Sequence, residues 1–250
     1  MSATAPPVPP AVTWHDAECG GYGADLPLWQ RLADERGGPV LDLGAGSGRV
    51  ALHLAARGHE VVAVELDPAL AAALCERARS RGLEDRLEIV RADVRELGLG
   101  REFPLVVAPM QLLHMLGGAT GRRRGLEAIR EHLAPGGLFA AAVLAEPLPA
   151  SGRAEPIPDV RDVDGWIHSS LPIEVRVSTE GLEIVRLRQL VAPDGEMSEE
   201  LDALAVDRLR PGVLEAELEA AGLAVAAARP IPETDEHVAS VALMIEASYG

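Results

Sequence analysis

Short apolar runs alternate with amphipathic stretches over the first 144 residues of the chain. The apolar runs predict five buried β-strands at 40–43, 60–65, 87–90, 104–109 and 138–144. The stretches with helical spacing predict helices at 26–35, 49–57, 70–81 and 121–133. Because apolar strands that alternate with helices pack as a sheet covered on both faces, this part of the chain predicts an α/β fold with a mostly parallel sheet.

The pattern changes after residue 145. Apolar and polar residues now alternate at 172–178, 181–192 and 202–209, and the turns Ser-Thr-Glu-Gly and Ala-Pro-Asp-Gly connect these segments. Such alternation is typical of antiparallel hairpins with one apolar face. A helix at 211–221 and a strand at 240–247 complete the chain. We therefore expect an antiparallel β insertion after the fifth strand.

These patterns divide the chain into three parts. Residues 1–20 begin with a Pro/Ala-rich stretch and predict a flexible N-terminal segment. Residues 21–144 and 209–250 predict the α/β domain, and residues 145–208 predict the insertion.

The charge of the chain limits its partners. The 250 residues carry a formal net charge of −16, which repels nucleic acid and anionic membranes, so we expect neither as a partner. The basic cluster Arg122–Arg124 is interpreted as a solvated loop before a helix. No segment has the apolar length of a membrane span or the pattern of a signal peptide, and the predicted location is the cytoplasm.

Two residue types are missing from the sequence, lysine and asparagine. Their absence excludes a P-loop lysine and a Schiff-base lysine. Cys19 and Cys75, the two cysteines, lack the spacing of metal ligands, and no metal site is expected.

The segment 40–49, Val-Leu-Asp-Leu-Gly-Ala-Gly-Ser-Gly-Arg, joins a predicted strand to a predicted helix. Its glycines at 44, 46 and 48 leave room for a ligand close to the backbone. A phosphate, a dinucleotide and an adenosine without phosphate are all candidates. Arg49 stands where a P-loop has lysine, and Gly-x-Gly-x-Gly differs from the dinucleotide pattern Gly-x-Gly-x-x-Gly.

Two acids stand at the ends of the next strands. Glu65 ends the second strand, where a carboxylate can accept hydrogen bonds from both ribose hydroxyls. Asp93 comes after the third strand, where a carboxylate can accept a hydrogen bond from the exocyclic amine of adenine. Each acid by itself could be a solvated strand end, but together with the glycine turn they indicate an adenosine site.

Four segments resemble the class I S-adenosylmethionine-dependent methyltransferases over about residues 22–144: Val-Leu-Asp-Leu-Gly-Ala-Gly-Ser-Gly-Arg, Val-Val-Ala-Val-Glu-Leu-Asp, Val-Arg-Ala-Asp-Val and Leu-Ala-Pro-Gly-Gly-Leu-Phe. The resemblance implies a Rossmann-like seven-stranded sheet with helices on both faces and an antiparallel last strand. It also implies S-adenosyl-L-methionine as cofactor, with S-adenosyl-L-homocysteine as product.

The resemblance also implies a role for each cofactor residue. The turn would contact the methionine part, the acids would bind the ribose and adenine, and the N-terminal segment would reach the carboxylate. The implied set is Gly44, Ala45, Gly46 and Gly48 with Asp42 for the turn, Glu65 for the ribose, Leu66, Asp93 and Val94 for the adenine, the Ala108 carbonyl for the amino group, and Arg49 with Tyr22 for the carboxylate.

The segment after the fourth strand narrows the class of methyl acceptor. Methyltransferases of nucleic-acid amines carry Asn-Pro-Pro-Tyr there, whereas this chain has Ala-Pro-Met-Gln-Leu-Leu-His-Met-Leu. The insertion resembles that of small-molecule methyltransferases, including sugar N-methyltransferases and glycine N-methyltransferase. The resemblance therefore implies methyl transfer to N or O, or to C, of a small metabolite. A non-catalytic regulatory or scaffold protein that binds the cofactor is the alternative, and the glycine spacing disfavours an oxidoreductase.

Histidines are the candidates for a general base. His114, shortly after the fourth strand, is the first candidate and His237, before the last strand, is the second; a packed apolar turn around His114 is the competing interpretation. Trp166 and His168 are candidate pocket residues. The apolar residues Ile173, Val175 and Val177 predict a face that covers the pocket or pairs in a homodimer, unless it simply packs on the edge of the main sheet.

Overall fold

A seven-stranded sheet carries the glycine turn. Its order is β11-β12-β5-β4-β1-β2-β3, with β1 Val40–Leu43, β2 Val61–Glu65, β3 Leu87–Arg91, β4 Phe103–Ala108, β5 Leu133–Leu144, β11 Leu223–Ile231 and β12 Ser240–Ala247. Strands β1 to β5 pair in parallel, and β12 is antiparallel to both β5 and β11. The predicted sheet, with its antiparallel last strand, is confirmed. The computed structural model describes residues 6–146, 152–153, 157–234 and 237–248.

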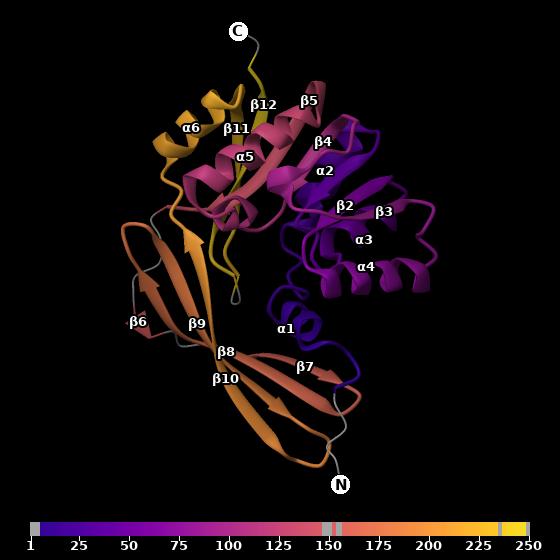
Figure 1. Ribbon diagram of the computed structural model, residues 1–250, viewed down its shortest axis with the longest axis vertical. Helices are drawn as coiled ribbons and strands as arrows, with labels where there is room; N and C mark the ends of the chain where they lie inside the picture. The colour runs from indigo at the N-terminus through magenta and orange to yellow at the C-terminus, as the bar shows by residue number, and fades with distance from the viewer. Residues whose placement is uncertain (1–5, 147–151, 154–156, 235–236, 249–250) are drawn as a thin grey trace.

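Helices cover both faces of this sheet (Figure 1). One face packs on α2 Leu26–Arg36, α3 Arg49–Ala55 and α4 Pro68–Ser80, and the other on η1 Val94–Glu96, η2 Leu112–Met115, α5 Gly118–Glu131 and α6 Pro211–Ala220. Successive side chains of a strand point to opposite faces, so Leu105 and Val107 join the first core while Val106 and Ala108 join the second. This explains why the strands read as continuous apolar runs.

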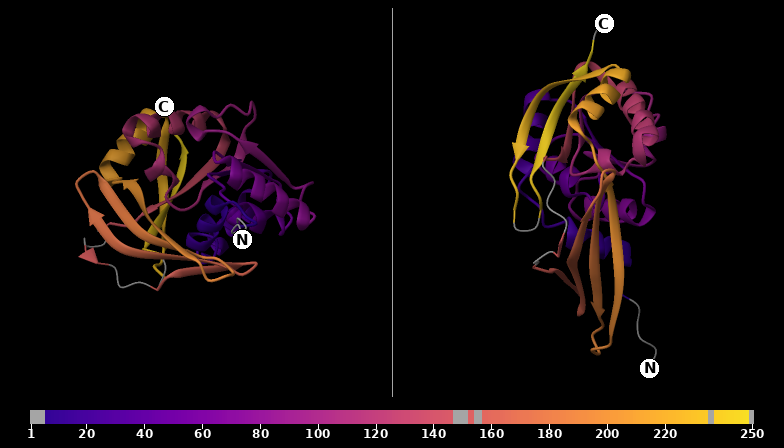
Figure 2. Two further views of the ribbon diagram at one scale, coloured as in Figure 1. Left: turned by 60° about the horizontal axis from the view of Figure 1, so that its bottom comes forward. Right: turned by 90° about the vertical axis from the view of Figure 1, so that its left-hand side faces the viewer.

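A second, five-stranded sheet comes after β5. Its order is β10-β9-β8-β6, and β7 pairs with β8; the bounds are β6 Gly152–Arg153, β7 Asp159–Val163, β8 Trp166–Val177, β9 Gly181–Val191 and β10 Met197–Asp207. All pairings in it are antiparallel, so the predicted antiparallel insertion is confirmed. Figures 1 and 2 show this sheet projecting away from the main sheet. The division at residues 145 and 208 stays a prediction.

The structure differs from the expected flexible segment at residues 1–20. Residues Pro10–Glu18 form helix α1, in which Val12 and Trp14 are buried. The Trp14 ring meets His168 of β8 edge-on, with 4.9 Å between ring centroids. Proline suits the first turn of a helix, and the helix is stabilised by packing that local composition does not reveal.

The arginine cluster also differs from its interpretation as a solvated loop. Helix α5 already begins at Gly118, and Arg122 is buried within it at 5% exposure. Its guanidinium forms ion pairs of 2.7 Å with Glu217 of α6 and with Asp207 at the end of β10. Arg122 therefore links helices α5 and α6, which pack on the main sheet, to the end of β10, the last strand of the second sheet.

Candidate cofactor and acceptor site

The glycine turn lies between the carboxyl end of β1 and the start of α3. Gly44, Gly46 and Gly48 have φ angles of +65°, +58° and +101°, in the left-handed region that favours glycine. A Cβ on Gly44 would stand 3.0 Å from the Leu112 side chain, and a Cβ on Gly46 would collide with the His15 ring. These glycine positions of the turn therefore disfavour any larger residue.

Glu65 is bonded directly to this turn. Its Oε2 accepts the Gly46 N–H at 2.7 Å, and its Oε1 accepts the Asp67 N–H at 2.8 Å. The side chain is buried, with 8% of the residue exposed. A carboxylate has about four lone-pair sites, so these two bonds leave about two sites for further donors. The acid predicted at this strand end thus stands beside the turn.

Asp42 lies beneath the turn in β1 and is completely buried. Among the residues that the structure describes, neither carboxylate oxygen forms a hydrogen bond of good geometry, although the nearby Ala51 N–H partly offsets its rise in pKa. Burial raises the pKa of Asp42 to about 7. An unpartnered buried carboxylate requires an explanation, and an ordered water or a bound ligand commonly satisfies such a group.

The residues predicted for adenine gather at the same edge. The Ala92 N–H donates to the Glu65 carbonyl at 3.1 Å, which brings Asp93 next to the end of β2. The Asp93 carboxylate accepts hydrogen bonds from the Arg95 backbone and guanidinium, and these bonds hold its pKa below the usual value. Leu66 is 57% exposed and offers an apolar surface. An adenine amine would have to share Asp93 with Arg95.

The remaining members of the predicted set are buried. Val94 packs in the core on one face of the sheet, and Ala108 ends β4 at 0% exposure. Ala45 is also buried, and its N–H donates to the Val64 carbonyl at 3.0 Å. For all three, only backbone groups are suitable for binding a polar ligand.

Arg49 is held by the N-terminal segment. Its guanidinium donates to both carboxylate oxygens of Asp25, at 2.5 and 2.9 Å, and to the Tyr22 carbonyl at 2.9 Å. The Arg49 side chain is 9% exposed. A cofactor carboxylate would have to share this arginine with Asp25, so the assignment of Arg49 and Tyr22 stays a prediction.

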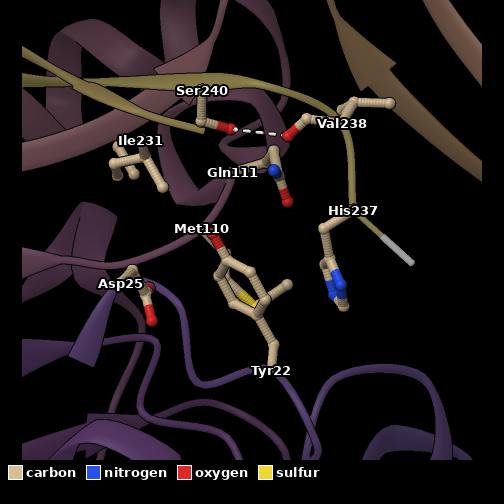
Figure 3. Close-up of a pocket in the computed structure, with 9 residues that line it drawn as sticks. Tyr22, Asp25, Met110, Gln111, Ile231, His237, Val238 and Ser240 are labelled. Atoms are coloured by element: carbon tan, nitrogen blue, oxygen red, sulfur yellow. Dashed lines mark hydrogen bonds between the residues drawn. The ribbon is translucent and has the colours of Figure 1, made fainter. Parts of the chain in front are cut away.

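A small cavity opens at the carboxyl ends of β4 and β5 (Figure 3). Residues from four parts of the chain line it: Tyr22, Asp25, Met110, Gln111, Ala142, Ile231, His237, Val238 and Ser240. The Tyr22 ring stacks on His237 with 4.2 Å between centroids. Met110 has φ +56°, which is uncommon for a residue other than glycine and is often found at functional sites. The cavity thus lies next to the edge that carries the glycine turn.

His114 has a different environment from His237. Its Nδ1 lies 2.7 Å from the Asp207 carbonyl, and its Nε2 lies 3.1 Å from the Leu144 N–H. Since a carbonyl only accepts and an N–H only donates, this arrangement holds the neutral ring with its proton on Nδ1. The residue is 3% exposed, and burial is the main cause that lowers its pKa. In this geometry both ring nitrogens are already bonded to the backbone.

Trp166 and His168 are not among the residues that line the cavity of Figure 3. His168 is 1% exposed and packs against Trp14, whereas Trp166 is half-buried at the start of β8. Their assignment to a pocket stays a prediction.

Helix α1 supplies residues that the sequence analysis missed. His15 lies over Gly46, and Asp16 accepts a hydrogen bond of 2.6 Å from the Ser47 hydroxyl and one of 2.9 Å from Arg77. Burial lowers the pKa of His15, which favours the neutral ring. A Pro/Ala-rich stretch carries no sequence signal for this contact, because it depends on how α1 packs in three dimensions.

Comparison with known proteins matches the part of the chain that contains these motifs. Residues 40–137 match the family model described as "Methyltransferase domain". A segment of 72 residues, 28% of this chain, is 36% identical to a tRNA1(Val) (adenine(37)-N6)-methyltransferase of Actinobacillus pleuropneumoniae. The match spans about 30% of that relative's length.

Solved structures match nearly the whole chain. The sugar N-methyltransferase KedS8 from Streptoalloteichus is 18% identical, with a TM-score of 0.74 over 97% of this chain and 96% of that one. The amino pentose methyltransferase CalS10 from Micromonospora echinaspora, solved with S-adenosylmethionine bound, is 20% identical, with a TM-score of 0.69 over 92% and 94%. Residues 40–137 thus match a methyltransferase domain, and the chain has the fold of the class I S-adenosylmethionine-dependent methyltransferases.

Proposed function

We propose that this protein transfers a methyl group from S-adenosylmethionine to a nitrogen or oxygen of a small metabolite. The observation that carries the proposal is the hydrogen bond of 2.7 Å between the Gly46 N–H and Glu65. It links a glycine-rich turn to a buried acid at the carboxyl edge of a parallel sheet, where ligands bind in open α/β folds.

The residues at this edge fit the cofactor. At Gly44, Gly46 and Gly48 an added Cβ would crowd the turn, and the buried Asp42 carboxylate lies beneath it. Glu65 keeps about two lone-pair sites for the ribose hydroxyls. His15 lies over Gly46, so it would lie against the methionine part of the cofactor or move aside.

S-adenosylmethionine supplies a methyl group that is already activated by its sulfonium. The chain therefore has to bind and orient an acceptor, exclude water and, where the acceptor carries a proton, take that proton. The cavity of Figure 3 lies beside the turn, but its volume of about 10 Å³ holds about one water, so an acceptor can enter only if the walls of the cavity move apart. Its lining combines apolar side chains with Gln111 and Ser240, which have polar groups that can orient an acceptor.

For the proton, the geometry favours His237 over His114. His237 borders the cavity, whereas His114 is not among its lining residues and is buried at 3% exposure. We therefore propose His237 as the first candidate for the base, which reverses the order that the sequence suggested. A pH–rate profile of His237→Gln is expected to lose the neutral limb, whereas retention of that limb would exclude His237.

A small acceptor is supported by two observations. The structures that resemble the whole chain include proteins named as sugar N-methyltransferase and amino pentose methyltransferase. The net charge of −16 also disfavours a nucleic-acid acceptor such as the tRNA of the relative matched over 72 residues. Nitrogen is therefore the first acceptor atom to test.

Two measurements test the proposal. Calorimetry should detect binding of S-adenosylhomocysteine and none of NAD. Transfer of tritiated methyl should then label members of a panel of amino sugars, amines and hydroxyl compounds but not tRNA, and Glu65→Ala should abolish the labelling. Binding without transfer to any class would favour the alternative of a regulatory or scaffold protein, and absence of binding would refute the proposal.

A homodimer through the insertion is a further part of the proposal. Val175 and Val177 pack against Leu144 and Leu182, so this part of the apolar face is covered within the chain. Strand β10, at the edge of the second sheet, instead exposes Met197 and Leu201 at 57% and 68%. Pairing of two β10 edges would place these side chains beside those of the second copy and partly cover them. Light scattering that gives the mass of one chain would exclude the dimer.

Among the residues that the structure describes, no helix is both long and apolar enough to cross a membrane. The cytoplasmic location stays a prediction from the sequence.

A further inference from the structure

A larger cavity of about 480 Å³ lies between the N-terminal segment and the outer sides of α3 and α4. Five arginines border it: Arg49, Arg57, Arg77, Arg81 and Arg161. It shares Tyr22, Gly48 and Arg49 with the predicted cofactor set, but Glu65, Asp93 and Ala108 are not among its lining residues. The cavity is therefore next to the cofactor edge and separate from the ribose and adenine positions.

The positive charge around this cavity exceeds the negative charge. Asp16 is the carboxylate among the lining residues; it pairs with Arg77 and lies 3.5 Å from Arg161. Arg49 is neutralised by Asp25. Arg57 donates to the ring and carbonyl of His53 instead of to a carboxylate.

Arg81 adds a further positive charge to this cavity. It is exposed, and no ion pair is found for it within the described part of the chain. About three positive charges thus have no carboxylate of their own: those of Arg57 and Arg81, and one of the two arginines that share Asp16. A chain with a net charge of −16 concentrates this positive charge around one cavity.

His53 lies among these arginines and is affected by their charge. It borders the cavity, and its Nε2 is buried without a hydrogen-bond partner in the described residues. Burial lowers the pKa of His53 most strongly, and the charges of Arg57 and Arg49 lower it further. Burial and, to a smaller extent, these two arginines therefore favour the neutral imidazole.

We propose that this cavity binds a phosphate-type oxyanion between α3 and α4. Guanidinium groups match the oxygens of phosphate with paired, charge-assisted hydrogen bonds, and several of them facing one cavity can bind a doubly charged group. The phosphate group is either a free ion or a part of a larger metabolite. This site does not depend on the proposed methyl transfer.

The test uses pyrophosphate and phenyl phosphate as probes, in calorimetry at constant ionic strength with chloride as the reference salt. The variant Arg57→Gln/Arg81→Gln removes two exposed guanidiniums, and Arg123→Gln/Arg210→Gln is the matched control with the same change in net charge on exposed residues outside the cavity. We expect the first variant to weaken pyrophosphate binding at least about tenfold and the control to weaken it less than about twofold.

The result with saturating S-adenosylhomocysteine separates this site from that of the cofactor. Unchanged pyrophosphate affinity supports a separate site, whereas competition would assign the cavity to the cofactor carboxylate and overturn the proposal. Equal weakening by both double variants, or no binding of either probe, would also overturn it. Phenyl phosphate that binds as tightly as pyrophosphate indicates the phosphate of a larger molecule, and binding of pyrophosphate alone indicates a free ion.

Discussion

The substitution Glu65→Gln tests both tasks of the acid at the end of β2. In the wild type, its two oxygens accept N–H groups from Gly46 and Asp67 at 2.7 and 2.8 Å. A glutamine amide has one accepting oxygen, and its NH₂ group would face the second N–H donor. One buried donor is then left unsatisfied, which costs about 1–3 kcal/mol of the free energy of unfolding.

Cofactor binding should be weakened separately. About two lone-pair sites of Glu65 remain for ribose hydroxyls, and a hydrogen bond to a charged group contributes about 1.5–3 kcal/mol. Loss of one such bond raises the dissociation constant of S-adenosylhomocysteine by roughly 10- to 100-fold. Calorimetry measures this constant, and urea unfolding without ligand measures the stability.

The matched control is Glu88→Gln, which removes the same charge from an exposed strand residue that pairs with Arg101. It should leave the cofactor affinity within about twofold, since exposed ion pairs contribute little. If Glu65→Gln lowered the stability but bound S-adenosylhomocysteine as tightly as the wild type, Glu65 would serve only to hold the turn. The assignment of the ribose to Glu65 would then be refuted.

Four further predictions use the same unfolding assay. Gly46→Ala should cost about 1–2 kcal/mol or more, because the position has φ +58° and its Cβ meets a ring; an unchanged midpoint would contradict the strain. Arg122→Ala should cost about 1–3 kcal/mol, because it removes a buried guanidinium that pairs with two partly buried acids, whereas the exposed Arg123→Ala should cost less than about 1 kcal/mol; equal costs would contradict the role of this ion-pair cluster. The lowered pKa of His114 means that the unfolded chain binds its proton first, so wild-type stability should fall as the pH drops below about 6.5, and less steeply in His114→Gln. The pKa of Asp42 is raised to about 7, so the folded wild type keeps a proton that the unfolded chain loses above a pH of about 4. Wild-type stability therefore falls between about pH 4 and 7, and Asp42→Asn should gain roughly 1.4 kcal/mol relative to it for each pH unit crossed. A difference that does not change with pH would refute the raised pKa.

The sequence by itself determined the central sheet and the candidate cofactor residues. Each buried strand is a continuous apolar run, and the residues that end these strands must meet at one edge because the strands are parallel. This is why the sequence alone could bring Glu65, Asp93 and the glycine turn together: their proximity is a consequence of the topology. The hairpins of the insertion could also be predicted from the sequence, because the alternation of apolar and polar residues and the turn residues are local signals.

Only the tertiary structure decided which polar groups are already occupied. The sequence placed His114 near the acceptor, but its ring nitrogens contact the backbone at Asp207 and Leu144, 93 and 30 residues away. From the sequence, Arg122 was interpreted as part of a solvated cluster, but in the structure it is buried between α5, α6 and the end of β10. Helix α1 is stabilised by contacts with distant elements, so no local pattern could predict that His15 lies over Gly46. These contacts join segments far apart in the chain, and a local pattern contains no information about such distances.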